Sequence, residues 1–356
     1  MKKVLLLQEA IPKYRVPVFE RLAEKYDFTV AYTKEKYAPG EVGFKSLFLP
    51  ETTFGPFIWI RGLRKKCKDF DVVIYMPDLH FISYCLIPVL PHRYKTISFG
   101  IGFRASYTRH YDLHKKKNIL DRLYGYFVFK GDAVLFYFKE VLSFWKKDKN
   151  IEKKCFETRN TVEVRPIEGV NEKKDSILFV GTLYPQKKVD VLIRSYFEVI
   201  SSTSFINCPI LKIVGGGVLL EELQALVKEL NIDDKVLFTG PIYDEKELAR
   251  HFAKAFVCVS PDQAGLSVPH SLGYGVPFVT TESAITGGEI LHIKDRENGV
   301  LMKSVKDLPS VLKDVFVNPN KYIQMGENAR RYYETSASVD IMVGGFDDAI
   351  QYAIRN

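Results

Sequence analysis

The segment SILFVGTLYPQKKVDVLIRSY, residues 176–196, contains the pattern that decides the fold. Its first five residues, four of them apolar, have the length of a buried strand, and Gly181 follows directly. After Lys187 the apolar residues recur at helical spacing. A strand, a glycine turn and an amphipathic helix in this order predict one unit of a parallel α/β sheet.

The same unit recurs along the whole chain. Each apolar run is short, ends in or near a turn residue, and alternates with a segment of helical spacing. In the second half the further runs are ILKIVGGG (210–217), KVLFTG (235–240), FVCVSP (256–261) and PFVTT (277–281). In the first half they include KVLLLQ (3–8), FTVAYT (28–33), DVVIYM (71–76) and AVLFYF (133–138). This predicts an α/β fold with two doubly wound parallel sheets.

Length and composition divide the chain. At 356 residues it is too long for one typical core. A polar stretch, ETRNTVEVRPIEGVNEKKDS, separates the two halves. We predict a Rossmann-like domain at 1–165, a second at 166–335, and a terminal helix at 336–356 that returns to the first domain.

Other classes of protein are disfavoured by what the sequence lacks. No run of 18 apolar residues predicts a membrane-spanning helix, and Glu9 and Pro12 interrupt the apolar start before a signal peptide would be complete. The five cysteines are scattered, which favours a reducing, cytoplasmic compartment without disulfides or structural zinc. The turns carry neither a GxGxxG nor a GxxxxGK[ST] motif, which argues against dinucleotide oxidoreductases and P-loop NTPases.

Charge is unevenly distributed. Residues 1–160 hold 30 Lys and Arg against 17 Asp and Glu, whereas the remainder holds 21 against 26. A basic first half suggests an anionic partner, such as nucleic acid, a membrane surface or a phosphorylated acceptor. No nucleic-acid-binding module is visible, so we expect no nucleic acid partner.

Two motifs of the second half fit an anionic ligand. Lys187 lies between a strand turn and a helix, where a cation opposes the helix dipole unless an anion is near; the alternative is a solvated lysine. In SPDQAGLSVPH, a tight turn at Gly265 would present the amides of Leu266 and Ser267 to a diphosphate. Asp262 and His270 flank this turn; the alternatives are a helix N-cap and a buried histidine.

Four blocks together resemble one family. ILFVGTLYPQKKVDVLIRSY, LKIVGGG, KVLFTGPI and SPDQAGLSVPHSLGYGVPFVTT are similar, in order and spacing, to the nucleotide-sugar domain of the retaining glycosyltransferases of the GT-B fold, family-4 type (glycosyl transferases group 1). The resemblance covers residues 176–302 well. It implies two Rossmann-like domains facing a crevice, and transfer of a sugar from a UDP- or GDP-linked donor with retention of configuration.

The resemblance also implies roles for individual residues. The family's two glutamates fall on Asp262, associated with the transferred sugar, and His270, associated with the ribose. The family's Arg and Lys for the diphosphate fall on Thr182 and Lys187, so one cation is missing here. The remaining donor positions implied are Gly215, Gly216, Pro241, Ile242, Gly265, Leu266 and Ser267. No DxD-like pair ends a strand, so we expect neither a metal nor another cofactor.

The acceptor side is expected in the first half. Lys13, Tyr14 and Arg15 follow the first strand, and Arg104 lies in SFGIGFRASYTRH; we predict phosphate contacts for both arginines and a catalytic role for Arg104. The alternative is that they are surface arginines. The family's donor-facing histidine has no match, since Ile101 lies nearest its position and the nearest histidines, His110 and His114, lie further along the chain.

Two basic and aromatic segments suggest a membrane surface, LHKKKNILDRLYGYFVFK (113–130) and WIRGLRKKCK (59–68). In the alternative interpretation, Ile119, Leu120, Leu123 and Tyr124 form a core stripe of one helix. Family analogy then predicts a glycan or lipid-linked glycan acceptor in bacterial surface polysaccharide synthesis, and a cytoplasmic protein peripheral to the plasma membrane. A sugar-nucleotide epimerase or phosphorylase fits less well, and the other hypothesis is a catalytically degenerate scaffold subunit.

Overall fold

The computed structural model describes residues 1–35, 40–105, 111–145, 149–165, 173–202 and 208–356. They form two compact units. Unit 1 contains Met1–Ala105, Asp112–Val162 and Val339–Asn356, and unit 2 consists mainly of Glu163–Ser338. The chain therefore passes between units next to Val162 and again next to Ser338, close to the predicted boundaries at 165 and 335.

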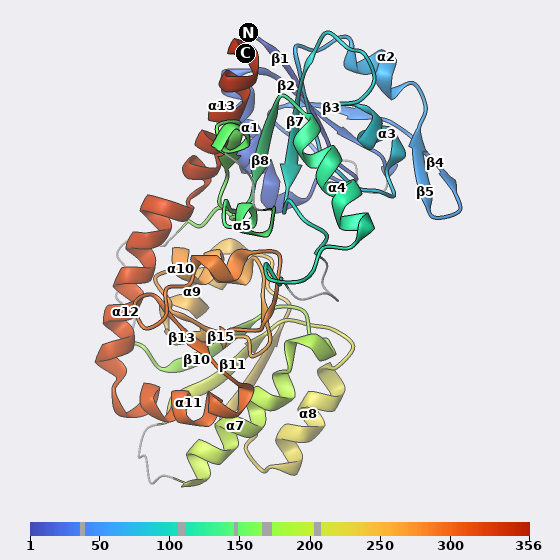
Figure 1. The fold of residues 1–356 in the computed structure, drawn as a ribbon. Coiled ribbons are helices and arrows are strands. Elements are labelled where there is room, and N and C mark those ends of the chain that lie inside the picture. Colours follow the sequence, from blue (N-terminus) through green and yellow to red (C-terminus); the bar gives the residue numbers. More distant parts are fainter. Residues whose placement is uncertain (36–39, 106–110, 146–148, 166–172, 203–207) are drawn as a thin grey trace. The chain divides into compact units, whose positions relative to one another are not determined.

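Unit 1 is built on a seven-stranded, fully parallel sheet with the order β3-β2-β1-β6-β7-β8-β9 (Figure 1). Its central strands are almost completely buried, as expected for a sheet covered on both faces. The strands are β1 (Lys3–Leu7), β2 (Asp27–Tyr32), β3 (Lys45–Phe48), β6 (Val72–Tyr75), β7 (Lys95–Gly100), β8 (Ala133–Phe136) and β9 (Cys155–Glu157).

Helices cover both faces of this sheet. The core on one face includes side chains of α1 (Val16–Lys25) and α13 (Val339–Arg355), and the core on the other includes side chains of α2 (Leu63–Cys67) and α3 (Ile82–Leu86). The remaining elements are a 3-10 turn, three helices and an antiparallel hairpin: η1 (Lys13–Arg15), α4 (Ile119–Lys130), α5 (Val141–Trp145), α6 (Lys149–Glu152), and β4 (Glu51–Phe54) with β5 (Phe57–Ile60).

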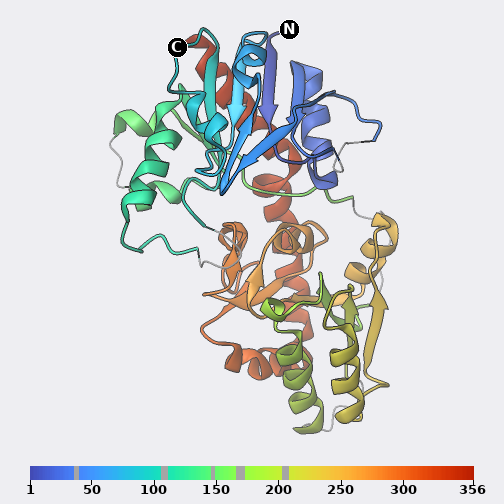
Figure 2. The same ribbon diagram turned by 90° about the vertical axis from the view of Figure 1, so that its right-hand side faces the viewer.

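Unit 2 contains a six-stranded parallel sheet with the order β12-β11-β10-β13-β15-β17. On one side of the sheet α7 lies between α8 and α11 (Figure 2). The strands are β10 (Ser176–Val180), β11 (Ile210–Val214), β12 (Val236–Gly240), β13 (Ala255–Val259), β15 (Phe278–Thr281) and β17 (Gly299–Met302). The helices are α7 (Val189–Ser202), α8 (Leu220–Glu229), α9 (Glu245–Ala253), α10 (Ser267–Gly273), α11 (Leu308–Val317) and α12 (Pro319–Tyr332).

Both units are therefore Rossmann-like, and the predicted α/β fold class is confirmed. In unit 2 the chain runs from β10 outward to β11 and β12, then returns to β13 on the opposite side of β10. Ligands of open parallel sheets bind outside the carboxyl ends of the strands at such a reversal of strand order. The topology thus points to the loops that follow β10 and β13.

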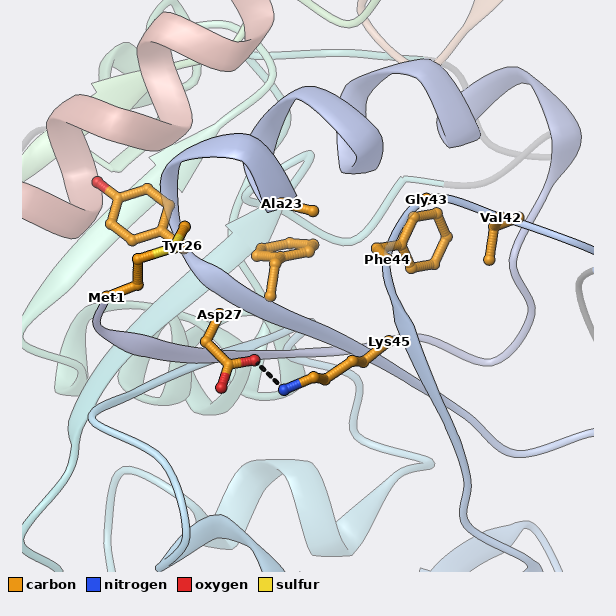
Figure 3. A pocket seen from close by; sticks show the side chains of 9 residues that line it. Met1, Ala23, Tyr26, Asp27, Val42, Gly43, Phe44 and Lys45 are labelled. Atoms are coloured by element: carbon orange, nitrogen blue, oxygen red, sulfur yellow. Dashed lines mark hydrogen bonds and ion pairs between the residues drawn. The ribbon is translucent and has the colours of Figure 1, made fainter.

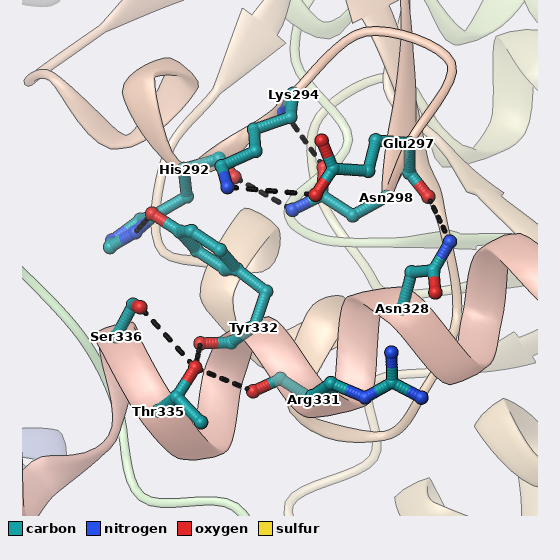
Figure 4. A network of polar contacts seen from close by, with 9 residues as sticks. All are labelled: His292, Lys294, Glu297, Asn298, Asn328, Arg331, Tyr332, Thr335 and Ser336. Carbon is teal, nitrogen blue, oxygen red and sulfur yellow. Dashed lines mark hydrogen bonds and ion pairs between the residues drawn. The ribbon is translucent and has the colours of Figure 1, made fainter.

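A polar network in unit 2 holds the loop before β17 against α12 (Figure 4). The fully buried His292 places Nδ1 3.3 Å from the hydroxyl of Tyr332. Asn298 donates to the carbonyl of His292 at 3.0 Å and accepts from the amide of Lys294 at 2.7 Å. These contacts are with neighbouring protein groups, which gives the network a structural role.

The terminal helix α13 belongs to unit 1, where it packs on α1 and on β7–β9. Phe346 is fully buried in that core, and Asp347 pairs with Lys25 of α1 at 2.8 Å. Gly345 allows the helix to approach β9 closely, because a Cβ added there would lie 2.0 Å from the carbonyl oxygen of Glu157. No helix among the described residues is long and apolar enough to cross a bilayer.

We predict that Gly345→Ala destabilises unit 1 by roughly 2–4 kcal/mol, since the backbone of α13 or β9 must shift to admit the methyl group. Gly344→Ala is the matched control: a Cβ there meets no atom within 4 Å, and alanine is favoured over glycine inside a helix by up to about 1 kcal/mol. Urea unfolding should give a free energy of unfolding that is highest for Gly344→Ala, intermediate for the parent and lowest for Gly345→Ala. Equal stability of the two variants would contradict this packing.

Candidate functional site

The candidate site lies where two loops of unit 2 meet at the carboxyl ends of β10 and β13. The first loop, residues 181–188, contains Gly181 and the 3-10 turn η3 (Pro185–Lys187). The second, residues 260–267, contains the short strand β14 (Gln263–Ala264) and leads into α10. A side-chain contact joins the loops, because the hydroxyl of Tyr184 donates a hydrogen bond to Oε1 of Gln263.

Backbone packing against the loop after β11 fixes the position of the first loop. A Cβ on Gly215 would lie 1.9 Å from the carbonyl oxygen of Gly181, and one on Gly217 would lie 2.4 Å from that of Leu183. The amide of Leu183 donates to the carbonyl of Gly216 at 3.0 Å. The glycines are therefore required because two chain segments touch, with Gly215 and Gly217 also at positive φ.

The other predicted residues of this region surround that contact. Gly216 lies beside Pro241, since a Cβ on Gly216 would be 3.4 Å from the ring of the proline. Pro241 is exposed and Ile242 is half-buried in the turn after β12. Thr182 is exposed at the start of the first loop and brings no charge.

Lys187 is buried at the base of the first loop, with only 8% of its surface exposed. The alternative of a solvated lysine is therefore wrong. Its ammonium forms no hydrogen bond or ion pair with any residue that the structure describes, and its Nζ lies 6.0 Å from the ring centre of Tyr184. Burial lowers the pKa of Lys187 to about 8, although the nearby Cys258 and Glu289 oppose this shift.

Asp262 is held by a partner that the sequence did not predict. Nζ of Lys188 lies 2.6 Å from Oδ2 of Asp262, whose side chain is 15% exposed. The hydroxyl of Thr281 donates to Oδ1 at 3.3 Å. The N-cap alternative for Asp262 is wrong, since the cap position of α10 is Leu266 and no side chain caps it.

Unsatisfied polar atoms cluster in the same segment. Among the described residues, five buried side-chain atoms lack a hydrogen-bond partner, and four of them lie between Ser260 and Thr280. They are the hydroxyls of Ser260, Ser267 and Thr280 and Nε2 of His270. A buried polar atom without a partner costs free energy that a bound ligand or water can recover. Ser267 is the one that begins α10.

His270 lies in a partly aromatic environment on α10. Its ring centre is 5.4 Å from that of Phe252 and 5.2 Å from that of Tyr274. Nε2 is 3.7 Å from Oε2 of Glu245, too far for a hydrogen bond but close enough to act electrostatically. The interaction with His270 is the main cause that lowers the pKa of Glu245. The predicted ribose contact of His270 stays a prediction.

The explanation for Gly265 changes. We expected this glycine to permit a tight turn, but its φ is not in the left-handed region. A Cβ added there meets no atom within 4 Å. The glycine therefore leaves open space beside Leu266 and Ser267, the two residues predicted to contact a diphosphate.

Residues 160–332, which contain both loops, match the family model of the glycosyl transferases group 1. The match covers slightly less than half of the chain. The family resemblance predicted from the four sequence blocks is thereby confirmed.

Individual relatives agree with this family. The D-inositol 3-phosphate glycosyltransferase of Gordonia bronchialis is 28% identical over 202 residues, which are 53% of this chain and 43% of the relative. The N-acetylgalactosamine-N,N'-diacetylbacillosaminyl-diphospho-undecaprenol 4-alpha-N-acetylgalactosaminyltransferase of Campylobacter jejuni is 36% identical over 93 residues, 25% and 24% of the two chains. The chain spans about half the length of the curated relatives it matches.

A solved structure extends the likeness of fold to nearly the whole chain. Anabaena Alr3699/HepE in complex with UDP superposes with a TM-score of 0.71 at 12% identity, covering 99% of this chain and 100% of that one. At this identity the likeness concerns the fold alone.

The residues predicted for the acceptor side lie in unit 1. Arg15 is 4% exposed, and its guanidinium donates to the carbonyl of Thr161 at 3.1 Å and to Oδ1 of Asn160. These contacts give Arg15 a structural role in place of the expected free phosphate ligand, and they also exclude a surface arginine. Arg104 lies 3.8 Å from the buried Asp121.

The other acceptor-side candidates are more accessible. Lys13 and Tyr14 are exposed on η1, beyond the carboxyl end of β1, and the ring of Tyr14 lies 5.0 Å from the guanidinium of Arg15. His110 lies outside the described residues, and His114 is exposed.

An open pocket elsewhere in unit 1 is distinct from the candidate site (Figure 3). It is lined by Met1, Tyr26, Asp27 and Lys45, among others, at the amino ends of the strands. Asp27 and Lys45 pair there at 2.6 Å. Because ligands of parallel sheets bind at the opposite ends of the strands, we do not assign the donor to this pocket.

Sequence reasoning missed three residues of the site: Lys188, Tyr184 and Gln263. Lys188 follows the predicted Lys187 directly, and only its backbone conformation shows that its side chain turns toward Asp262. The available signal was Lys188 itself, a second cation in a loop where Thr182 stands in place of the family's arginine.

Proposed function

We propose that this chain is a glycosyltransferase that moves a sugar from a nucleoside-diphosphate sugar to a glycan or lipid-linked glycan, with retention of configuration. The observation that carries the proposal is the buried Lys187, whose ammonium forms no hydrogen bond or ion pair with the described residues. It lies at the reversal of strand order of a domain whose sequence matches the family model of the glycosyl transferases group 1.

Burying the ammonium group of Lys187 costs free energy. An ammonium removed from water is destabilised unless an anion compensates it, and the lowered pKa of Lys187 expresses that cost. A diphosphate placed at the loop would supply the missing negative charge. The free hydroxyl of Ser267 and the open space at Gly265 suit the same ligand.

The proposed mechanism follows from the charges. When the bond between sugar and diphosphate breaks, negative charge grows on the leaving diphosphate, and Lys187 stabilises it without needing to reorganise. Asp262 would accept hydrogen bonds from hydroxyls of the transferred sugar. We propose no metal or other cofactor; among the described residues no group of three or more His, Cys, Asp and Glu could hold a metal ion.

The donor base is proposed to be uracil or guanine. The solved structure of Alr3699/HepE contains UDP, which supports a uridine nucleotide in a similar fold. Pro241 and Ile242, in the turn after β12, are the proposed contacts of the base, and His270 that of the ribose.

We predict that UDP or GDP raises the melting temperature of the parent protein, and that Lys187→Met lowers affinity for that diphosphate by about 100-fold. The variant should be at least as stable as the parent at pH 7, because methionine buries no charge. Lys228→Met, an exposed position on α8, is the control and should bind like the parent. Unchanged binding by Lys187→Met would remove this residue from the site.

An assay of sugar transfer and donor hydrolysis separates the alternative function, a degenerate scaffold subunit. The exposed, uncharged Thr182 favours that alternative, because the family's arginine is absent there. Diphosphate binding without sugar transfer or donor hydrolysis would support the scaffold. Transfer to a glycan acceptor would support the enzyme.

We further propose that the acceptor is met at the inner face of the plasma membrane, as expected for surface polysaccharide synthesis. Helix α4 supports this. Ile119 is 81% exposed, and Leu120, Leu123 and Tyr126 are each between 45% and 48% exposed. The alternative of a core stripe is wrong for three of its four residues and holds only for Tyr124.

Cations surround these exposed apolar side chains. Lys116, Arg122 and Lys130 are exposed on and beside α4. Nζ of Lys117 lies 5.7 Å from the ring centre of Trp145 in an adjoining hollow. Apolar side chains ringed by cations match the interface of a bilayer with anionic headgroups.

We predict that the protein sediments with vesicles containing phosphatidylglycerol, and weakly with phosphatidylcholine alone. Ile119→Glu with Leu123→Glu should reduce sedimentation about tenfold, by removing apolar contact and adding negative charge. Val317→Glu, at a 54% exposed position in unit 2, is the control. Equal sedimentation of the double variant and the parent would exclude α4 as the contact.

A further inference from the structure

Lys188 has a backbone conformation that side chains rarely adopt. Its φ is 49° and its ψ is 46°, which places it in the left-handed region where glycine is favoured. The position ends η3 and directly precedes α7, and a glycine would take it without strain. A lysine held there suggests that its side chain has a task that offsets the strain.

The side chain has a definite contact. Its ammonium lies 2.6 Å from Oδ2 of Asp262, while the other carboxylate oxygen accepts from the hydroxyl of Thr281. The lysine is 39% exposed and the aspartate 15%. The pair therefore lies at the edge of the site, where the ammonium can exchange partners without becoming buried alone.

Lys187 and Lys188 belong to the same site. The ring of Tyr184 faces Nζ of Lys187, and the hydroxyl of Tyr184 donates to Gln263, the residue next to Asp262. The loop after β10 therefore contributes two ammonium groups to this site, those of Lys187 and Lys188. Lysine suits such an exchange, because its ammonium is a point charge at the end of a flexible four-carbon chain.

We infer that Lys188 is the second cation of the diphosphate site, stored on Asp262 in the free protein and transferred to the diphosphate when the donor binds. The inference rests on the proposed function and explains how the loop works without a charge at Thr182. Transfer of the ammonium also frees Oδ2 of Asp262 to accept a hydrogen bond from the sugar. Each partner of the ion pair then has a ligand group of its own.

The site charges agree with this assignment. In the free protein the charges of Lys188 and Asp262 offset each other, and the ammonium of Lys187 forms no ion pair with the described residues. After the exchange two cations face a diphosphate, whose charge exceeds that of a single lysine. If Lys188 were only a clamp, a residue that holds Asp262 in place, its ion pair with Asp262 would persist in both the free and the donor-bound protein.

The test compares stability with affinity in one series of variants. Lys188→Gly relieves the left-handed strain, so its melting temperature should equal or exceed that of the parent. Its affinity for UDP or GDP, whichever the parent binds, should fall about tenfold or more, as expected for loss of a charge-assisted contact. Affinity for UMP or GMP should change less than about twofold, and Lys188→Arg should retain most of the diphosphate affinity.

Asp262→Asn distinguishes a stored cation from a clamp. Without its counterion Lys188 is free to meet the diphosphate, so this variant should bind UDP or GDP at least as tightly as the parent. The gain should vanish when Lys188→Gly is added, which a double-mutant cycle by calorimetry measures. A clamp predicts instead that both single variants weaken binding.

The outcomes are separable. If the parent binds UDP or GDP and Lys188→Gly binds it equally well, this inference fails and the proposed function stands. If the parent binds no nucleoside diphosphate, the donor site fails and this inference with it. Loss of diphosphate affinity in a variant as stable as the parent supports the assignment.

Discussion

The burial of one ammonium group is the constraint on which the candidate site depends. Lys187 lies in the loop after β10. Its side chain is almost shielded from water, and its ammonium forms no ion pair with any of the described residues. A folded protein rarely retains such a group for stability, because an apolar side chain of similar size would make the folded state more stable. A bound anion would stabilise the charged form of this lysine and offset the free energy of its burial. The site therefore favours negatively charged ligands before any other contact forms.

The rest of unit 2 keeps this cation in place. The glycines after β11 bring that loop into backbone contact with the loop of Lys187, so its path cannot relax toward solvent. The reversal of strand order puts the Asp262 loop beside it, and the contact between Tyr184 and Gln263 joins the two. The unpaired hydroxyls between Ser260 and Thr280 give the same surface further capacity to bind. Fold, loop packing and polar groups therefore agree on one location.

The roles assigned to Lys187 and the other site residues stay predictions, but the sequence predicted the sheets and the family resemblance, because these depend on local patterns and ordered motifs. It did not predict features set by distant contacts or side-chain direction. Arg15 is buried because residues 160–161 and α13 pack around it, and Lys188 reaches Asp262 only through a left-handed backbone. The composition of α4 fitted a core stripe as well as an exposed face, and only the exposure of Ile119, Leu120 and Leu123 excludes the core stripe for these residues.

The most direct test of the account is the pKa of Lys187, measured by NMR of the labelled lysine side chains and assigned by the signal missing in Lys187→Met. Burial lowers this pKa to about 8 in the free protein, whereas a bound diphosphate stabilises the charged form and must raise it. Diphosphate affinity should correspondingly fall as the pH rises through 8. The account predicts a pKa near 8 that increases when UDP or GDP binds. A pKa near the ordinary 10.5 that neither nucleotide changes would contradict it.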